Sequence, residues 1–130
     1  MDKLASKIQK LTYTEHFYDP AEHEPAGRTV YEFNPSGIID VSEYDSGDDV
    51  PFTDDYFLKP DEAGKLYEDV VRCMQTATTV TVFVDDTTAE AVLHFADGEI
   101  TLPRGLGDGK KCLGDIITRY IARSLKKVAK

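Results

Sequence analysis

The most constraining feature of this sequence is an apolar stripe in the segment that begins at Pro60. Its members recur at spacings of three and four residues, which places them on one face of a helix. They are Ala63, Leu66, Tyr67, Val70, Val71 and Met74. Pro60 is tolerated in a first helical turn, and Asp61 and Glu62 complement the positive end of a helix. A helix of this kind requires a second layer that covers its stripe.

The segment after this helix contains β-branched residues and two turn signals, Asp86-Thr87 and Asp97-Gly98. A hairpin closed at the first turn would pair Val80 with Leu93, and one closed at the second would pair Leu93 with Leu102. Both registers place Leu93 on the same apolar face. We therefore predict a three-stranded antiparallel meander.

A second apolar stripe predicts a C-terminal helix from Leu113 to Val128. It comprises Leu113, Ile116, Ile117, Tyr120, Ile121, Leu125 and Val128. Arg119 and Arg123 lie on the opposite face of this helix. The pattern indicates one buried face and one basic, solvated face.

The N-terminal half is less regular. Leu4, Ile8 and Leu11 have helical spacing, so residues 1–27 are predicted to form a short helix followed by an irregular arm. Residues 45–59 are acidic and aromatic, and we interpret them as a loop packed on the domain rather than as a linker.

Residues 28–44 are predicted to form a β-hairpin. A three-residue loop at Pro35-Ser36-Gly37 would pair Phe33 with Ile39 and Tyr31 with Val41, with Gly37 in a left-handed conformation. The resulting order is helix, two strands, loop, helix, three strands and helix. We therefore predict a single α+β domain of 130 residues, an antiparallel sheet with its helices mainly on one face.

Residues 60–128 are similar in element order and size to the double-stranded RNA-binding domain. Lys110 and Lys111, at the end of a Gly-rich stretch, resemble the basic start of the last helix of that family. The resemblance implies RNA binding. The third cation of the family would fall near Gly114-Asp115, which supplies none, and the helix at Pro60 opens with two acids. These departures leave the chain without an assigned family.

Charge is distributed unevenly along the chain. The net charge is −9, but residues 1–102 carry −15 and residues 103–130 carry +6. Nucleic-acid binders neutralise phosphates with clustered Lys and Arg, so the overall balance disfavours nucleic acid as a partner. No run approaches the roughly 18 apolar residues of a membrane span, and no signal peptide is apparent. We expect a cytoplasmic protein with no membrane contact, in which Cys73 and Cys112 are thiols.

The Gly-rich segment before the C-terminal helix is the candidate anion site. Backbone N–H groups at a helix start, flanked by cations, can hold a phosphate or a carboxylate. The candidate residues are Arg104, Gly105, Gly107, Gly109, Lys110 and Lys111. The alternative is a structural connection whose glycines permit tight turns.

The acidic-aromatic segment is the candidate surface for a protein partner with a basic face. The candidate residues are Asp48, Asp49, Phe52, Asp54, Asp55 and Tyr56. The alternative is that the aromatic side chains fold back onto the core.

No catalytic or metal-binding pattern is apparent. Cys112 follows two Lys residues at a predicted helix start, but the sequence does not place His94 close to it. The acids and histidines between Glu15 and Glu24 match no compact metal motif, so no metal and no cofactor are predicted. We therefore expect a small non-enzymatic binding protein with an acidic surface for a protein partner. An inhibitor or immunity-type protein that faces a nuclease is a special form of it.

Two other functions stay open. One is binding of an anion, a nucleotide or RNA through residues 105–111 and the basic C-terminal helix. The other is an enzyme that uses Cys112 or a pair of carboxylates. A homodimer formed through an exposed apolar stripe that includes Phe83 and Val92 is also compatible with the pattern.

Overall fold

The structure is a computed structural model that describes residues 4–19, 24–45, 50–81, 87–108 and 111–126. Seven strands form one antiparallel sheet in the order β7-β6-β1-β2-β3-β4-β9. Their bounds are β1 Lys10–Asp19, β2 Glu24–Phe33, β3 Ile38–Asp45, β4 Phe52–Phe57, β6 Thr87–Phe95, β7 Gly98–Pro103 and β9 Leu125–Lys126. Two short strands, β5 Thr79–Val80 and β8 Leu106–Gly107, form a separate pair.

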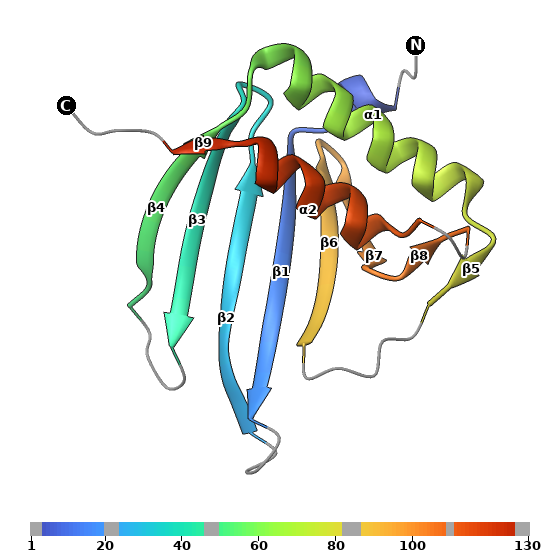
Figure 1. Cartoon of the computed structure of the whole chain (residues 1–130). Coiled ribbons are helices and arrows are strands. Elements are labelled where there is room, and N and C mark those ends of the chain that lie inside the picture. The colour runs from blue at the N-terminus through green and yellow to red at the C-terminus, as the bar shows by residue number, and fades with distance from the viewer. Residues whose placement is uncertain (1–3, 20–23, 46–49, 82–86, 109–110, 127–130) are drawn as a thin grey trace.

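Helices α1 (Pro60–Thr76) and α2 (Leu113–Arg123) lie on the same face of the large sheet (Figure 1). The predicted class, an α+β domain with helices on one face of an antiparallel sheet, is therefore confirmed. Among the described residues, no helix is both long enough and apolar enough to cross a membrane.

The core forms between this face and the two helices. Leu11, Phe33 and Leu93 are almost fully buried on the sheet, opposite Leu66 of α1 and Ile117 of α2. Because alternate strand residues point to opposite faces, these side chains define which face of each strand carries the helices. This face is called the helix side below.

The predicted β2–β3 hairpin is confirmed in its register. Phe33 pairs with Ile39 and Tyr31 with Val41. Gly37 has φ +98°, and a Cβ there would lie 2.3 Å from the Leu58 carbonyl oxygen. Glycine is therefore required both by the turn and by the close approach of a neighbouring backbone.

The predicted N-terminal helix and irregular arm are wrong. Only Ala5–Lys7 form a single 3-10 turn, and the described residues that follow form β1 and β2. Leu11 and Tyr13 are buried, whereas Thr12 is half-buried on the opposite face. β1 is a central strand between β2 and β6, so pairing on both sides overrides the local helical spacing.

The predicted acidic loop is also partly wrong, because Phe52–Phe57 form β4 and pair with β3. The sequence of β4, Phe-Thr-Asp-Asp-Tyr-Phe, lacks a regular alternation of polar and apolar residues, so its pairing with β3 determines which side chains face the core. Residues 46–49 lie outside the described part of the chain.

The predicted three-stranded meander is replaced by a different pairing. β5 pairs with β8, and β6 pairs with β1 instead of with β5. The β6–β7 hairpin is real, but Leu93 pairs with Ile100 rather than with Leu102. A shift of two residues keeps the same side chains on the same face. The meander that carried the resemblance to the double-stranded RNA-binding domain is therefore not present.

The second stripe does form a helix, but α2 ends at Arg123. Leu125 is exposed and belongs to β9, which pairs with β4 at Tyr56 and Phe57. Val128 lies outside the described residues. The end of the helix thus leads the chain to the far edge of the sheet.

Candidate functional site

Several strands of the sheet extend beyond the helices that cross them. β1 and β2 have ten residues each. Figure 1 shows β1–β4 and β6 continuing past α2, where none of the described helices lies over the sheet. This half of the helix side is called the open face below.

The register determines which side chains the open face presents. Glu15 pairs with Thr29, Thr29 with Glu43 and Glu43 with Phe52, which makes one row across four strands. This row lies two residues beyond the row that contains Tyr13 and Tyr31, and so it points to the helix side. The next row contains Phe17 and Asp45. The open face is therefore defined by Glu15, Phe17, Glu43, Asp45 and Phe52.

The open face combines carboxylates with exposed aromatic rings. Phe52 is 71% exposed and Phe17 is 37% exposed. Glu43 and Asp45 are exposed, and Glu15 is half-buried. Exposed aromatic rings are enriched on surfaces that bind another protein, and carboxylates beside them complement a basic partner.

Two of these carboxylates converge on Tyr31. Burial raises the pKa of the Glu15 carboxyl, and the nearby positive charge of Arg104 only partly opposes this. The pKa of Tyr31 is also raised, first by burial and then by the negative charges of Glu15 and Glu43. The open face therefore holds a concentrated negative potential where the sheet meets α2.

A recess of about 180 Å³ lies at this junction, and its lining includes Tyr31, Glu43, Tyr56 and Ile121. A cavity of about 150 Å³ accepts a group the size of benzene, whereas drug-sized ligands need roughly 300–1,000 Å³. The recess thus has room for a single side chain with one carboxylate and two phenol rings around it.

The residues predicted as an anion site do not form one cluster. Arg104 is half-buried beneath α2, where its positive charge partly opposes the rise that burial causes in the pKa values of Glu15 and Tyr13. Lys111 lines a groove between the two helices instead. Gly109 and Lys110 lie outside the described residues.

Gly105 and Gly107 have a packing role. A Cβ on Gly105 would lie 2.0 Å from the Thr81 carbonyl oxygen, and a Cβ on Gly107 would lie 2.0 Å from the Lys111 carbonyl oxygen. Their own carbonyls accept hydrogen bonds of 2.9 Å from Thr81 and Thr78. Glycine at these positions allows β8 to approach β5 and the turn before α2.

The predicted partner-binding residues are divided by the alternation of β4. Phe52, Asp54 and Tyr56 point to the helix side, whereas Asp55 points to the opposite face of the sheet. Tyr56 is half-buried in the recess, so one aromatic folds back onto the core, whereas Phe52 remains exposed. Asp54 forms an ion pair of 3.1 Å with Lys126 of β9. Asp48 and Asp49 lie outside the described residues.

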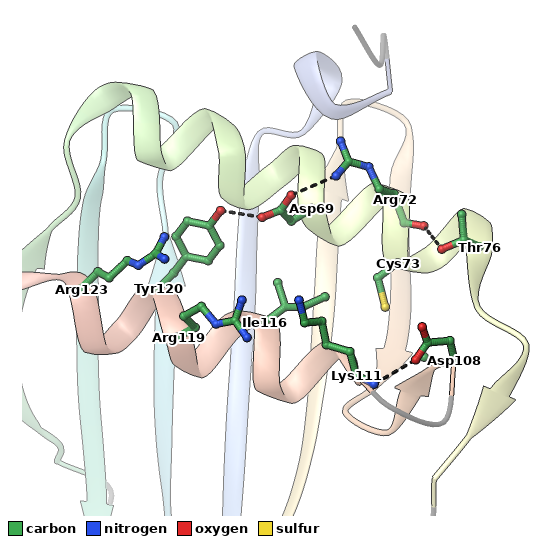
Figure 2. Close-up of a pocket in the computed structure, with 11 residues that line it drawn as sticks. Asp69, Arg72, Cys73, Thr76, Asp108, Lys111, Ile116, Arg119, Tyr120 and Arg123 are labelled. Atoms are coloured by element: carbon green, nitrogen blue, oxygen red, sulfur yellow. Dashed lines mark hydrogen bonds and ion pairs between the residues drawn. The ribbon is translucent and has the colours of Figure 1, made fainter.

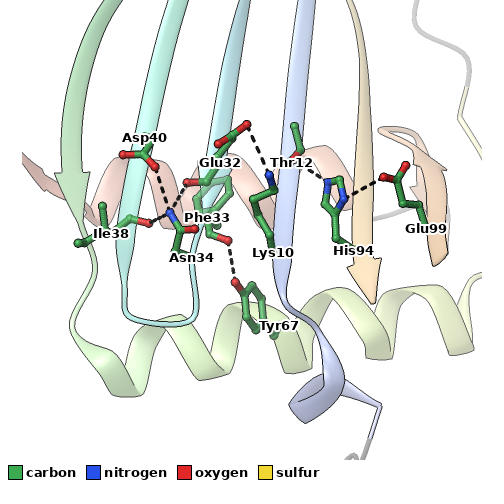
Figure 3. A network of polar contacts seen from close by, with 10 residues as sticks. All are labelled: Lys10, Thr12, Glu32, Phe33, Asn34, Ile38, Asp40, Tyr67, His94 and Glu99. Carbon is green, nitrogen blue, oxygen red and sulfur yellow. Dashed lines mark hydrogen bonds and ion pairs between the residues drawn. The ribbon is translucent and has the colours of Figure 1, made fainter. Parts of the chain in front are cut away.

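Cys112 and His94 are not brought together. Cys112 is buried at the N-cap of α2, where burial raises the pKa of its thiol. His94 lies on the face of the sheet opposite to the helix side, between the Thr12 hydroxyl at 2.9 Å and the Glu99 carboxylate at 3.2 Å (Figure 3). The sheet thus separates the thiol from the imidazole.

The carboxylates and histidines of β1 do not form a metal site. Glu15 and His16 are adjacent in the strand and therefore point to opposite faces. No group of three His, Cys, Asp or Glu side chains that could hold a metal ion occurs among the described residues.

Sequence reasoning missed Glu15, Phe17 and Glu43 as members of one surface. Their convergence depends on pairing across β1, β2 and β3, whereas the sequence pattern predicts an irregular arm within residues 1–27. The alternation of Leu11 and Tyr13 with Thr12 and Thr14 was the available signal.

No model of a known protein family matches this chain, and no curated protein matches it in sequence.

Proposed function

We propose that this protein is a non-enzymatic binding module that captures a protein partner through its acidic open face. The observation that supports it is the row of Glu15, Glu43 and Phe52 on a half of the sheet that neither α1 nor α2 covers. A partner with a basic segment matches this row in charge and gains apolar contact with the exposed ring of Phe52.

The recess beside Tyr31 supports a more specific mode of contact. A Lys or Arg side chain of the partner fits its volume, and its cationic group would meet Glu43, with the phenol rings of Tyr31 and Tyr56 alongside. Cations bind favourably over aromatic faces. The raised pKa of the Glu15 carboxyl indicates a partly desolvated acid, which gains more from an incoming cation than a fully hydrated one does.

The test uses the full chain and a lysine-rich extended peptide as the probe. Glu15→Gln and Glu43→Gln together are expected to lower the affinity for the peptide at least several-fold. The affinity of the unaltered protein for the peptide should fall steeply as the salt concentration rises, because salt screens exposed charges. Glu90→Gln is the matched control for each of the two changes made singly, since it removes one carboxylate from the opposite face of the same sheet.

Two results would contradict the proposal. One is a loss of affinity in Glu90→Gln equal to that of the open-face variants, because the overall charge of the protein would then explain the effect without the open face. The other is peptide binding that is indifferent to salt.

A further inference from the structure

We propose that the groove between α1 and α2 binds a small phosphorylated ligand, at a site separate from the open face. The groove encloses a cavity of about 320 Å³. Sites for small ligands and cofactors have volumes of roughly 300–1,000 Å³, so this one suits a compact phosphate ester. Its mouth is on the side of the helices that faces away from the sheet (Figure 2).

Four cationic side chains line the groove, although the whole chain carries a net charge of −9. Arg72 comes from α1, Lys111 from the turn before α2, and Arg119 and Arg123 from α2 itself. Figure 2 shows the side chains of Lys111 and Arg119 extending toward one another over Ile116. These two side chains have no ion-pair partner among the described residues, whereas Arg72 pairs with Asp69 at 3.6 Å.

The two carboxylates of the groove are already engaged. The Tyr120 hydroxyl donates a hydrogen bond of 2.6 Å to Asp69, which also carries the ion pair with Arg72. Asp108 accepts a hydrogen bond of 2.9 Å from the backbone N–H of Lys111. The groove therefore keeps an excess of positive charge around Lys111 and Arg119.

The arrangement of the cations on α2 also favours a bound anion. Arg119 and Arg123 are four residues apart on one face of the helix, a spacing at which like charges repel. Arg123 lies over the Tyr120 ring, 5.5 Å from its centroid, and does not turn away from the groove. An anion held between these side chains relieves the repulsion, and Ile116 with the Tyr120 ring supplies an apolar wall for the organic part of a ligand.

A phosphate dianion fits this chemistry better than a nucleic-acid strand does. Guanidinium and ammonium groups bind phosphate oxygens by charge-assisted hydrogen bonds. The cations are gathered in one cavity of small-ligand size, while a polymer leaving the groove would meet the remaining, strongly acidic molecule.

The experiment titrates the full chain with inorganic phosphate, a nucleoside monophosphate and a nucleoside diphosphate at low ionic strength. Calorimetry gives the affinity, and backbone amide shifts near Lys111 and Arg119 locate the site. Arg119→Gln is expected to weaken binding about tenfold, because it removes a charge-assisted contact. Arg119→Lys, which keeps the charge, should lose less. Lys65→Gln is the matched control, since it removes an exposed cation of α1 outside the groove.

Saturable binding of a phosphate ester that Arg119→Gln weakens and Lys65→Gln does not would support the proposal. Absence of binding by every probe at millimolar concentration would overturn it, and so would an equal loss in Lys65→Gln. Binding of an RNA oligomer without binding of any small phosphate would also overturn it. Arg119→Gln should leave capture of the lysine-rich peptide unchanged, so the two proposals fail separately.

Discussion

The hydrogen bond from Tyr120 to Asp69 joins α2 to α1, and its removal makes the sharpest test of how the two helices are held together. The Tyr120 side chain is 3% exposed, and its hydroxyl lies 2.6 Å from the Asp69 carboxylate. In Tyr120→Phe the ring stays in place while the hydroxyl is lost. The change therefore isolates one bond between two elements.

The expected loss follows from the charge and the exposure of the acceptor. A hydrogen bond to a charged group contributes about 1.5–3 kcal/mol. Asp69 is 35% exposed and also pairs with Arg72, so water replaces part of what is lost, and we expect the lower end, about 1.5 kcal/mol. With a urea m-value of about 1.5 kcal/mol/M, the midpoint of unfolding falls by about 1 M.

The assay is urea denaturation followed by far-ultraviolet circular dichroism, with Tyr44→Phe as the control. Tyr44 makes its contact through the ring, which Arg28 covers at 3.9 Å, so loss of its hydroxyl should change the midpoint little. A double-mutant cycle with Asp69→Asn separates the pair energy from other effects of each change. A coupling energy near zero, or a midpoint of Tyr120→Phe equal to that of the unaltered protein, would refute the reasoning.

The same bond predicts a dependence on pH. The pKa of Tyr120 is raised from 10.0 to about 12, first by burial and then by the Asp69 carboxylate. The folded protein therefore favours the protonated hydroxyl more than the unfolded chain does. The stabilisation is complete below pH 10 and is lost as the pH rises from 10 to about 12. The difference in unfolding free energy between the unaltered protein and Tyr120→Phe should shrink over that interval.

Three further outcomes are expected. Gly37→Ala should destabilise the protein by at least about 2 kcal/mol in thermal unfolding. An alanine in the left-handed conformation costs about 1–2 kcal/mol, and its Cβ would also clash with the Leu58 carbonyl oxygen. An unchanged Tm would contradict the turn geometry. Gly64→Ala should stabilise it by roughly 0.5–1 kcal/mol, since Gly64 lies inside α1 and a Cβ there meets nothing within 4 Å. Cys73 and Cys112 should react slowly with a chromogenic disulfide reagent at neutral pH until urea unfolds the chain. The reason is that both thiols are buried and that burial raises the pKa of each. Fast reaction of Cys112 in the folded protein would instead support the enzyme hypothesis.

The parts of the fold that could be predicted from the sequence are those encoded within about twenty consecutive residues. The apolar stripe of α1 and the Pro35-Ser36-Gly37 turn are local signals, and each appears in the structure as expected. The segment from Leu4 to Leu11 fits both a helix and the start of a strand. Pairing of β1 with β2 and with the distant β6 decides between them.

The open face was beyond prediction for the same reason. Glu15 and Glu43 are 28 residues apart, and they converge because Thr29 pairs with both. The anion-binding hypothesis places Arg104 and Lys111 together, but Gly105 and Gly107 pack tightly against neighbouring backbone, and the two cations lie on different sides of α2. A charge count along the chain carries no information about such separation.

The place of β1 in the centre of the sheet has a consequence for how the molecule assembles. Thr12 of β1 contacts His94 of β6, which lies 82 positions further along the chain, so forming that pair costs the closure entropy of a long loop. Folding should be slow compared with that of helical domains of similar size. During synthesis the first sixty residues emerge from the ribosome before β6 does, and one edge of β1 stays unpaired until β6 has also emerged.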